Sequence, residues 1–295
     1  MQQKYQVFLA VVEEKNFSRA AEKLFITQPA VSQYIRTLEK EMGTVLFDRG
    51  GKTVTLTRAG EIVLVHVQEM NRIYESMHRT LDEYVHQPKG VLKIGASYTF
   101  GEHVLPKIMA SFLKRYPAIE PSVTIGNTQE ICTKISARML DIGLIEGDRV
   151  QKDLQVMTVG VDKMYIVAKR NHPLYARDGL RFSDLEQATW LIRERGSGTR
   201  EAAEKMFAQL QIKPQKKIEF GSTHIIKESV EAGLGIALLS EWAVKKELKH
   251  GSLTIIPCEE MPFTRKFSII RAPSQFEAKT CEVFRETVIE FLKDV

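Results

Sequence analysis

The feature that most constrains the fold is a break at residues 87–90, where Gln87-Pro88-Lys89-Gly90 separates two different sequence patterns. Before the break, apolar residues recur at helical spacing. After it, short apolar runs alternate with amphipathic segments. Because proline and glycine interrupt helices, we expect a mainly helical N-terminal part and a C-terminal part that alternates strands and helices. A length of 295 residues fits two or three domains.

The first sixty residues predict three helices and a two-stranded wing. Ser18 is expected to cap the second helix, Thr27 caps the third with Pro29 in its first turn, and Gly43 ends it. A basic, glycine-rich segment lies between the two strands. The expected elements are helices at residues 2–14, 19–24 and 28–42 and strands at 45–47 and 53–56.

The third helix divides into an apolar and a polar face. The apolar face, which must pack inward, consists of Val31, Ile35, Leu38 and Met42. The polar face consists of Gln28, Ser32, Gln33 and Arg36. Such side chains can bond to base edges in the major groove, although a plain three-helix module with a solvated polar face would show the same periodicity.

The amino-acid sequence of this segment favours the DNA-binding interpretation. Residues 17–24 (FSRAAEKL), 27–32 (TQPAVS) and the residues that follow to Gly60 closely resemble the winged helix-turn-helix of the LysR family. The resemblance implies that Gln28, Pro29, Ser32 and Gln33 face the groove, and that Arg49 or Lys52 of the wing reaches the minor groove or the backbone. Members of the family often have Arg or Lys where this chain has Gln33. The expected DNA-binding residues are Ser18, Thr27, Gln28, Pro29, Ser32, Gln33, Arg36, Arg49 and Lys52.

Thr57 is expected to cap a long helix from Arg58 to about His86. Its apolar residues recur at a spacing close to 3.5, as in a coiled coil; they are Ala59, Val63, His66, Met70, Ile73, Met77, Leu81 and Tyr84. So long a helix needs a packing partner. The partner is either the helix's own domain or, as the resemblance favours, a second copy of the chain. His66 is interpreted as a tolerated core histidine rather than a pH sensor.

From Val91 onward, repeated β-α alternation predicts mainly parallel sheets covered on both faces. Ligands of such sheets bind in loops at the carboxyl ends of strands. One loop, Gly196-Ser197-Gly198-Thr199-Arg200, opens a helix and offers hydroxyls, free amides and a cation, which suits an anion. The same loop could be an ordinary N-cap with a glycine turn. The other polar loops are Ser97-Tyr98-Thr99 and Asn127-Thr128.

This half resembles the periplasmic-binding-protein-like sensor of LysR regulators, with an inducer between two α/β subdomains joined by crossing strands near 162–167 and 266–270. The sequence Gly-Ser-Gly-Thr-Arg is similar to that found in members of the family that sense small anions in sulfur or carbon assimilation. The expected effector-binding residues are Ser97, Tyr98, Thr99, Asn127, Thr128, Ser197, Gly198, Thr199, Arg200, Thr223 and His224. The expected domains are the winged helix-turn-helix (1–58, with the helix-turn-helix at 18–37), the linker and dimerisation helix (59–87) and the effector-binding domain (88–295, with subdomain I at about 91–161 and 268–295 and subdomain II at about 162–267).

Composition and charge add weaker constraints. The chain is 43% hydrophobic and 27% charged, as in globular proteins, and no apolar run is long enough to span a membrane. Residues 1–58 hold nine Lys/Arg and six Asp/Glu, and the net charge of +5 does not single out the DNA-binding end. Cys132, Cys258 and Cys281 form no CxxC pair, so we expect a reduced cytoplasm and no metal site. No secretory signal peptide is expected.

The leading hypothesis is therefore a promoter-binding transcription regulator, dimeric or tetrameric, that responds to a small anionic metabolite and needs no cofactor. The resemblance implies double-stranded DNA, further copies of the chain and RNA polymerase as partners. A cytoplasmic solute-binding or sensor protein without promoter regulation is the alternative, but it would leave residues 1–86 unexplained. An enzyme is not expected, because the chain has no GxSxG, HExxH or CxxC motif, no Walker A loop and no dinucleotide GxGxxG between a strand and a helix.

Overall fold

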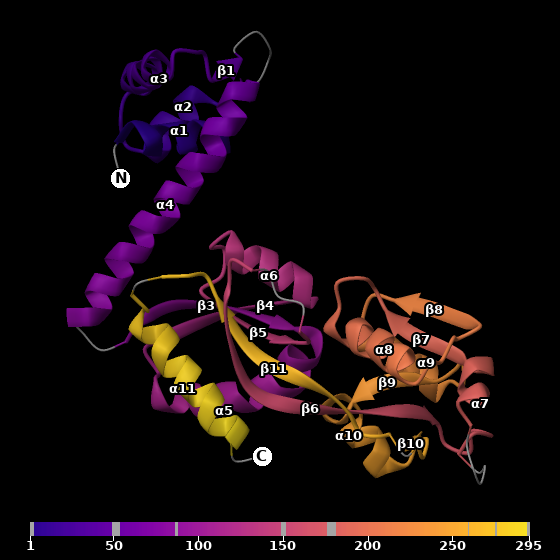
Figure 1. Cartoon of the computed structure of the whole chain (residues 1–295). Coiled ribbons are helices and arrows are strands. Elements are labelled where there is room, and N and C mark those ends of the chain that lie inside the picture. Colours follow the sequence, from indigo (N-terminus) through magenta and orange to yellow (C-terminus); the bar gives the residue numbers. More distant parts are fainter. Residues whose placement is uncertain are drawn as a thin grey trace. The chain divides into compact units, whose positions relative to one another are not determined.

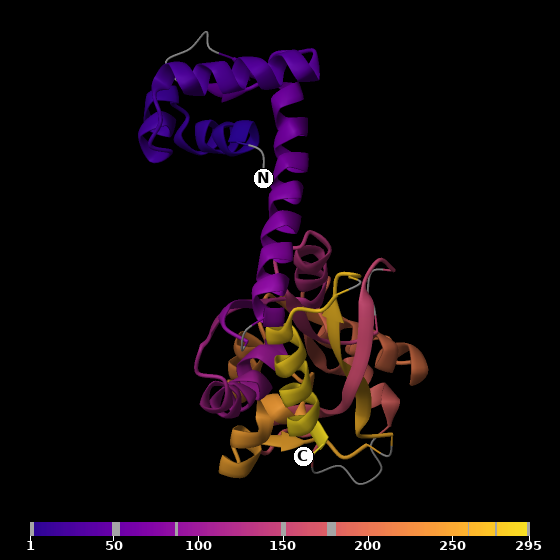
Figure 2. The ribbon, with the colours of Figure 1, turned by 90° about the vertical axis from the view of Figure 1, so that its left-hand side faces the viewer.

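The computed structural model describes residues 3–48, 54–85, 88–148, 152–175, 181–258, 260–274 and 276–293. The chain divides into two compact units, Met1–Asp82 and Glu83–Val295. Among the described residues, no helix is both long and apolar enough to cross a bilayer. The elements of the first unit are helices α1 (Gln3–Glu14), α2 (Phe17–Lys23), α3 (Gln28–Met42) and α4 (Arg58–Val85) and strands β1 (Phe47–Asp48) and β2 (Thr55–Leu56), shown in Figures 1 and 2.

The first unit packs α1, α2 and α3 around one apolar core. Three of the four predicted inward residues of α3, Val31, Ile35 and Leu38, are fully buried. The prediction is wrong for Met42, which is 41% exposed, because α3 ends there and the chain turns away at Gly43. Gly43 adopts a φ of 71°, in the left-handed region that favours glycine at a helix end. β1 and β2 pair antiparallel, as expected for the base of a wing.

The helix caps of this unit follow the sequence with one exception. Thr27 caps α3, and its Oγ1 accepts from the Ala30 amide at 3.4 Å. Ser18 does not cap α2. Asn16 caps it instead, because its extended backbone lets Oδ1 accept from the amides of Ser18 at 2.8 Å and Arg19 at 3.1 Å. The helix therefore begins at Phe17, and Ser18 lies exposed in its first turn.

The long helix α4 has two different environments along its length. Near its start, Ala59 and Val63 pack against the core of α1–α3, and Val67 is buried there. Farther along, the predicted seam is uncovered in the single chain, and His66 is exposed as well rather than in a core. The exposed seam residues are Met70, Ile73, Met77 and Leu81. The N-terminal half of α4 thus packs on its own unit, and the C-terminal half presents an apolar surface.

The second unit contains a mixed sheet rather than the mainly parallel sheets that we expected. β3 pairs in parallel with β4 and β5, but β11 and β6 run antiparallel to each other and to the strands beside them. The cause is that two long strands cross the unit in opposite directions. The strands are β3 (Gly90–Ser97), β4 (Ile119–Gly126), β5 (Ile142–Glu146), β6 (Gln155–Lys169), β7 (Thr189–Arg193), β8 (Lys216–Phe220), β9 (Ala237–Ser240), β10 (Leu253–Ile255) and β11 (Phe263–Arg271).

Helices cover these strands in two lobes (Figure 1). The first lobe holds β3, β4 and β5 with the π-helix η1 (Phe100–Val104), α5 (Leu105–Arg115), α6 (Thr128–Ser136) and α11 (Lys279–Lys293). The second lobe holds β7–β10 with α7 (Phe182–Gln187), α8 (Gly198–Gln209), α9 (Thr223–Glu231) and α10 (Glu241–His250). Separate apolar clusters fill the two lobes.

β6 and β11 pass from one lobe to the other, and this confirms the predicted crossing strands. Their register places Arg265 directly opposite Asp162. On one side of that pair β11 pairs with β5 of the first lobe, and on the other side β6 pairs with β9 of the second lobe. Charged side chains thus meet where the two lobes are joined.

Candidate DNA-reading and effector-binding sites

The exposed face of α3 carries the side chains suited to reading bases. Gln28, Gln33 and Arg36 are exposed and Ser32 is half-buried. Gln28 Nε2 donates to Ser32 Oγ at 3.0 Å, which fixes the two side chains side by side at the start of the helix. Pro29, in the first turn, is exposed. Arg49 and Lys52 lie outside the described residues.

The predicted effector residues of the first lobe are almost fully buried. Ser97 ends β3 and Thr99 follows it; each is 1% exposed. Thr128 begins α6, and its Oγ1 donates to the Glu146 carbonyl at 3.0 Å. The Asn127 side chain is committed to capping α6, because it accepts from the Glu130 amide at 2.9 Å.

Residues of the second lobe meet them from the start of α8. Ser197 caps this helix and accepts from the Thr199 amide at 3.2 Å. Gly198 passes so close to β5 that a Cβ would lie 2.1 Å from the Glu146 carbonyl oxygen, so only glycine permits this approach. The Gly196 carbonyl accepts from the Gln129 amide at 3.1 Å, which joins the loop before α8 to α6. The structure therefore brings the Ser97, Asn127 and Ser197 loops together.

Three of the predicted effector residues have other surroundings. Arg200 is engaged on three sides, since it donates to Glu204 at 2.6 Å, Glu219 at 2.8 Å and the Arg193 carbonyl at 2.8 Å. His224 has a largely exposed side chain, 4.0 Å from Glu228. Tyr98 lies beneath the Arg193 guanidinium, whose carbon is 4.5 Å from the ring centroid.

Arg193 itself was not predicted. It is 1% exposed, forms an ion pair with Glu194 at 2.7 Å and donates to Thr223 Oγ1 at 2.8 Å. Thr223 is thus bonded to a buried cation of the second lobe. In the sequence, Arg193 only follows the short apolar run Trp190-Leu191-Ile192, and nothing there marks it as part of a site.

The centre of the site is a set of buried polar side chains contributed by both lobes and by the crossing strands. We call it the inter-lobe cluster. Each member is at most 6% exposed. The members are Ser97, Thr99, Thr128, Glu146, Asp162, Ser197, Thr199, Ser240 and Arg265.

Glu146 is the least expected member. It ends the apolar strand β5, accepts from Ser97 Oγ and the Thr99 amide, and lies 3.7 Å from Arg265 Nη1. Burial raises the pKa of Glu146, and the charge of Arg265 opposes this shift. A carboxyl group therefore already occupies the hydroxyl and amide donors that we had assigned to an effector.

Arg265 connects the remaining members. Its Nε donates to Asp162 Oδ2 at 2.8 Å and its Nη1 to Thr199 Oγ1 at 3.0 Å. Asp162 also accepts from Ser240 Oγ at 2.6 Å. Neither Asp162 nor Arg265 could be found from periodicity, because their pairing depends on the register of two strands about a hundred residues apart.

Two polar atoms of the cluster have no partner among the described residues, Thr99 Oγ1 and Arg265 Nη2. Buried polar groups almost always find a hydrogen bond, and leaving one unmet costs about 1–3 kcal/mol. Both atoms could bond to a small ligand. Within the described ranges, no three His, Cys, Asp or Glu side chains are grouped to hold a metal ion.

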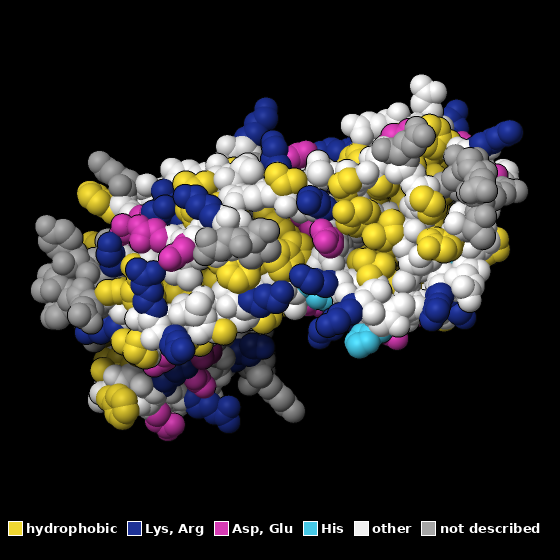
Figure 3. Space-filling view, turned by 90° about the horizontal axis from the view of Figure 1, so that it is seen from below, with side chains coloured by type: hydrophobic (Ala, Val, Ile, Leu, Met, Phe, Trp, Pro, Cys, Tyr) yellow, Lys and Arg dark blue, Asp and Glu magenta, His cyan; other side chains and the backbone are white. Residues whose placement is uncertain are grey.

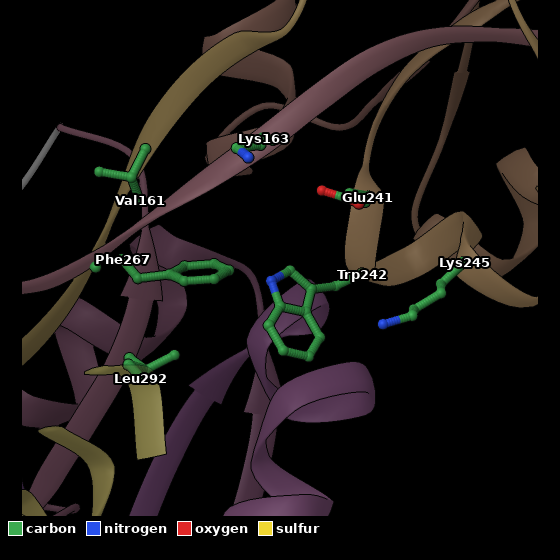
Figure 4. A pocket seen from close by; sticks show the side chains of 8 residues that line it. Val161, Lys163, Glu241, Trp242, Lys245, Phe267 and Leu292 are labelled. Carbon is green, nitrogen blue, oxygen red and sulfur yellow. The ribbon is translucent and has the colours of Figure 1, made fainter. Parts of the chain in front are cut away.

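A more open hollow of about 270 Å³ lies elsewhere between the lobes (Figure 4). Trp242 of α10 projects toward Phe267 of β11, with Lys163, Lys245 and Glu241 around the rim. The three charged residues are exposed, and neither of the unmet polar atoms belongs to this lining. On the face drawn in Figure 3, basic side chains are dispersed among apolar and acidic ones. The charges on this face are therefore mixed and form no single basic patch.

Comparison with known proteins identifies the family of each part of the chain. Residues 3–61 match the family described as "Bacterial regulatory helix-turn-helix protein, lysR family", and residues 86–293 match "LysR substrate binding domain". The HTH-type transcriptional regulator CysL of Bacillus subtilis (strain 168) is 39% identical over 277 residues, which cover 94% of this chain and 93% of CysL.

Two solved structures share the fold. CbnR in complex with its target DNA has a TM-score of 0.68 and 18% identity, and the match covers 99% of this chain and all of CbnR. The regulatory domain of Synechocystis PCC6803 CcmR in complex with 2-PG has a TM-score of 0.65 and 24% identity, and the match covers 70% of this chain and 99% of that domain.

The two family matches together span nearly the whole chain, and CysL is a transcriptional regulator rather than an enzyme. Along the chain, the match to the regulatory helix-turn-helix comes first and the match to the substrate-binding domain follows it. This chain belongs to the LysR family of bacterial transcriptional regulators, which bind DNA and carry an effector-binding domain.

Proposed function

We propose that this regulator reads its promoter with the exposed face of α3. Gln28, Ser32 and Gln33 supply neutral donors and acceptors for base edges, and Arg36 supplies a charge for guanine or phosphate. CbnR, which has the same fold, has been solved on its target DNA, and this supports the assignment. Thr27 and Pro29 at the helix start, Ser18 on α2 and the wing residues Arg49 and Lys52 complete the proposed DNA-binding surface.

The effector is a small acid held by the inter-lobe cluster. The observation that carries this proposal is the pair of buried, unmet atoms Thr99 Oγ1 and Arg265 Nη2. Thr99 belongs to the first lobe, and Arg265 is bonded to Thr199 of the second, so a ligand bonded to both atoms favours one arrangement of the lobes over another. CcmR, a structural neighbour, was solved with 2-PG in its regulatory domain, which supports a small-molecule ligand in this part of the chain.

The assembly is a dimer or tetramer built through α4 and the effector domain, and it acts on promoters in the cytoplasm together with RNA polymerase. The exposed apolar residues of α4 supply the dimer surface, since a charged or polar seam would not associate. In this proposal residues 1–58 bind DNA, residues 59–87 link and dimerise, and residues 88–295 sense the effector.

Footprinting tests the proposal directly. The purified full-length protein is placed on the DNA upstream of its own gene and titrated with a panel of small organic and inorganic acids. We expect a protected site whose extent changes with one class of acid, and we expect Thr199→Val to shift this change to roughly tenfold higher acid concentration while the protection remains. A protein that gives no protection on that DNA, or whose response to the acid is the same in wild type, Thr199→Val and Thr99→Val, contradicts it.

A further inference from the structure

Among the residues that the structure describes, the inter-lobe cluster has no cation free for an added anion. Arg265 is paired with Asp162 at 2.8 Å, and the other buried arginine nearby, Arg193, is paired with Glu194 at 2.7 Å. Glu146 is a third acid, and it faces an arginine that is already neutralised. An anion that enters the cluster therefore lies beside a buried carboxyl group without a compensating positive charge.

Such a site distinguishes between acids by whether they can donate a hydrogen bond. Two deprotonated acids side by side repel each other strongly in a buried environment. A ligand that has a hydroxyl, an ammonium or a retained acidic proton beside its anionic group can instead donate to the Glu146 carboxylate. Its anionic oxygens then accept from Thr99 Oγ1 and Arg265 Nη2, the two donors that are unmet.

We propose that Glu146 makes the cluster selective for small acids that carry a hydrogen-bond donor, such as hydroxy acids, amino acids and protonated oxyanions like hydrogen phosphate, over acids that can only accept. The inference rests on the proposed effector site and names the class of ligand that the site takes. Glu146 touches the ligand in this scheme and sets its specificity.

With the wild-type carboxyl group in place, a fully deprotonated anion can bind in only one protonation state of the site. For sulfate to bind, Glu146 must take up a proton and become the donor itself. Burial already raises the pKa of Glu146, so this route is open but is coupled to pH. At a pH where Glu146 is ionised in the free protein, binding of sulfate consumes a proton, whereas binding of a ligand that brings its own donor consumes fewer.

The experiment uses matched pairs of probes on the full-length protein. Phosphate and sulfate have the same shape and differ in the retained proton; glycolate and acetate differ in one hydroxyl. Calorimetry in buffers of different ionisation enthalpy gives the affinity and the number of protons taken up. We expect wild type to prefer the donor-bearing member of each pair by roughly tenfold or more.

Glu146→Gln is the decisive variant, because an amide is nearly isosteric, uncharged and able to donate. The preference for phosphate over sulfate should fall by roughly tenfold or reverse, and the proton uptake with sulfate should disappear. An unchanged preference in Glu146→Gln, or wild-type binding of sulfate as tight as phosphate without proton uptake, overturns the inference. So does the absence of millimolar binding of every donor-bearing probe. If Glu146→Gln does not fold, the proton count on wild type still decides between these outcomes.

Two further variants separate this inference from the proposed site. Thr199→Val removes an acceptor of Arg265 within the cluster, and Lys245→Ala alters only the rim of the hollow beside Trp242. If the probes bind in the cluster, Thr199→Val weakens them and Lys245→Ala does not. The opposite result places the ligand elsewhere and removes the proposed site. If Thr199→Val weakens the binding of the probes but Glu146→Gln keeps the wild-type preference for phosphate over sulfate, the proposed site stands and only the selectivity of Glu146 is contradicted.

Discussion

Arg265 Nη1 donates to Thr199 Oγ1 across 3.0 Å, although the two residues lie 66 positions apart and on different elements. Arg265 belongs to β11, which joins the lobes, and Thr199 belongs to the first turn of α8 in the second lobe. The bond therefore ties the start of a helix to the strand about which the lobes are joined. A ligand that replaces or adds to this bond acts on the connection itself.

The first prediction concerns this bond. Thr199→Val keeps the shape of the side chain and removes the hydroxyl, so Arg265 loses one of the acceptors that hold its guanidinium in place for the proposed ligand. We expect effector affinity to fall by roughly tenfold, with operator affinity in the absence of effector unchanged. Thr99→Val should behave alike, although Thr99 lies on the other lobe.

Calorimetric titration of the effector into each variant measures this loss. His224→Ala is the control, since its side chain is two-thirds exposed, and it should match wild type. Wild-type effector affinity in both valine variants would show that the two hydroxyls do not contribute to effector binding.

The second prediction separates base reading from phosphate binding on α3. Gln28→Ala and Gln33→Ala should each weaken binding to the cognate operator by about 1–3 kcal/mol and change binding to random DNA little. Gln6→Ala, on an exposed position of α1, serves as the control. Equal losses on both DNAs would mean that the glutamines do not read bases.

Arg36→Ala should act differently, because a cation bound to phosphate contributes to affinity on every sequence. We expect weaker binding to both DNAs and a salt dependence whose slope falls by about one. Fluorescence anisotropy at several salt concentrations measures the slope. An unchanged slope combined with lost sequence preference would instead assign Arg36 to a base.

The parts of the fold that the sequence predicted are those set by local patterns. The period of α3, the cap at Thr27 and the glycine at the end of α3 each depend on residues within one or two turns. The cap of α2 was misplaced because Asn16 and Ser18 are both good caps, and only the extended backbone of Asn16 decides between them.

The chemistry of the proposed effector site was only partly predictable. The loops with Ser97 and Ser197 could be found, because serine and glycine at strand ends are recognisable. Glu146 and Arg265 could not, since each ends or continues an apolar strand and its role comes from register and from contact between the lobes. The antiparallel crossing strands also explain why the sheet is mixed, which the β-α alternation does not reveal.

The third prediction concerns assembly through α4. Met70→Lys and Ile73→Lys should yield monomers, because an unpaired charge buried in a dimer seam costs several kcal/mol. Both side chains are exposed in the single chain, at 42% and 51%, so folding of the first unit should be unaffected. Gln68→Lys adds the same charge to an exposed position outside the predicted seam and should remain dimeric.

Sedimentation distinguishes the outcomes, and circular dichroism checks that the helices are intact. The monomeric variants should bind a full operator far more weakly than wild type, since one winged helix-turn-helix contacts only half of a two-fold symmetric site. A dimer that persists in both lysine variants would place the interface outside α4.

The fourth prediction is a loss of stability on acidification that depends on His103. This side chain is in η1 and 23% exposed. Burial, reinforced by Lys227, lowers its pKa from 6.5 to about 4. The folded state therefore binds fewer protons than the unfolded state between these values, and His103 favours folding above pH 6.5 and loses that contribution as the pH falls toward 4.

The shift corresponds to at most about 3 kcal/mol, and partial exposure reduces it. Glu247 changes stability in the same direction, because its burial alone would raise its pKa but its bond with Lys227 lowers it. The contribution of His103 therefore has to be taken from the difference between the wild-type and variant pH profiles.

His103→Gln cannot take up the proton, and we expect its free energy of unfolding to fall less steeply than that of wild type between pH 6.5 and 4. Urea unfolding of the isolated residues 88–295 at a series of pH values measures the difference. Because Glu102 lies 3.8 Å from the imidazole, Glu102→Gln is a useful control, and it should leave most of the wild-type slope in place. Parallel pH profiles for wild type and His103→Gln would show that His103 is as readily protonated in the folded protein as in the unfolded chain.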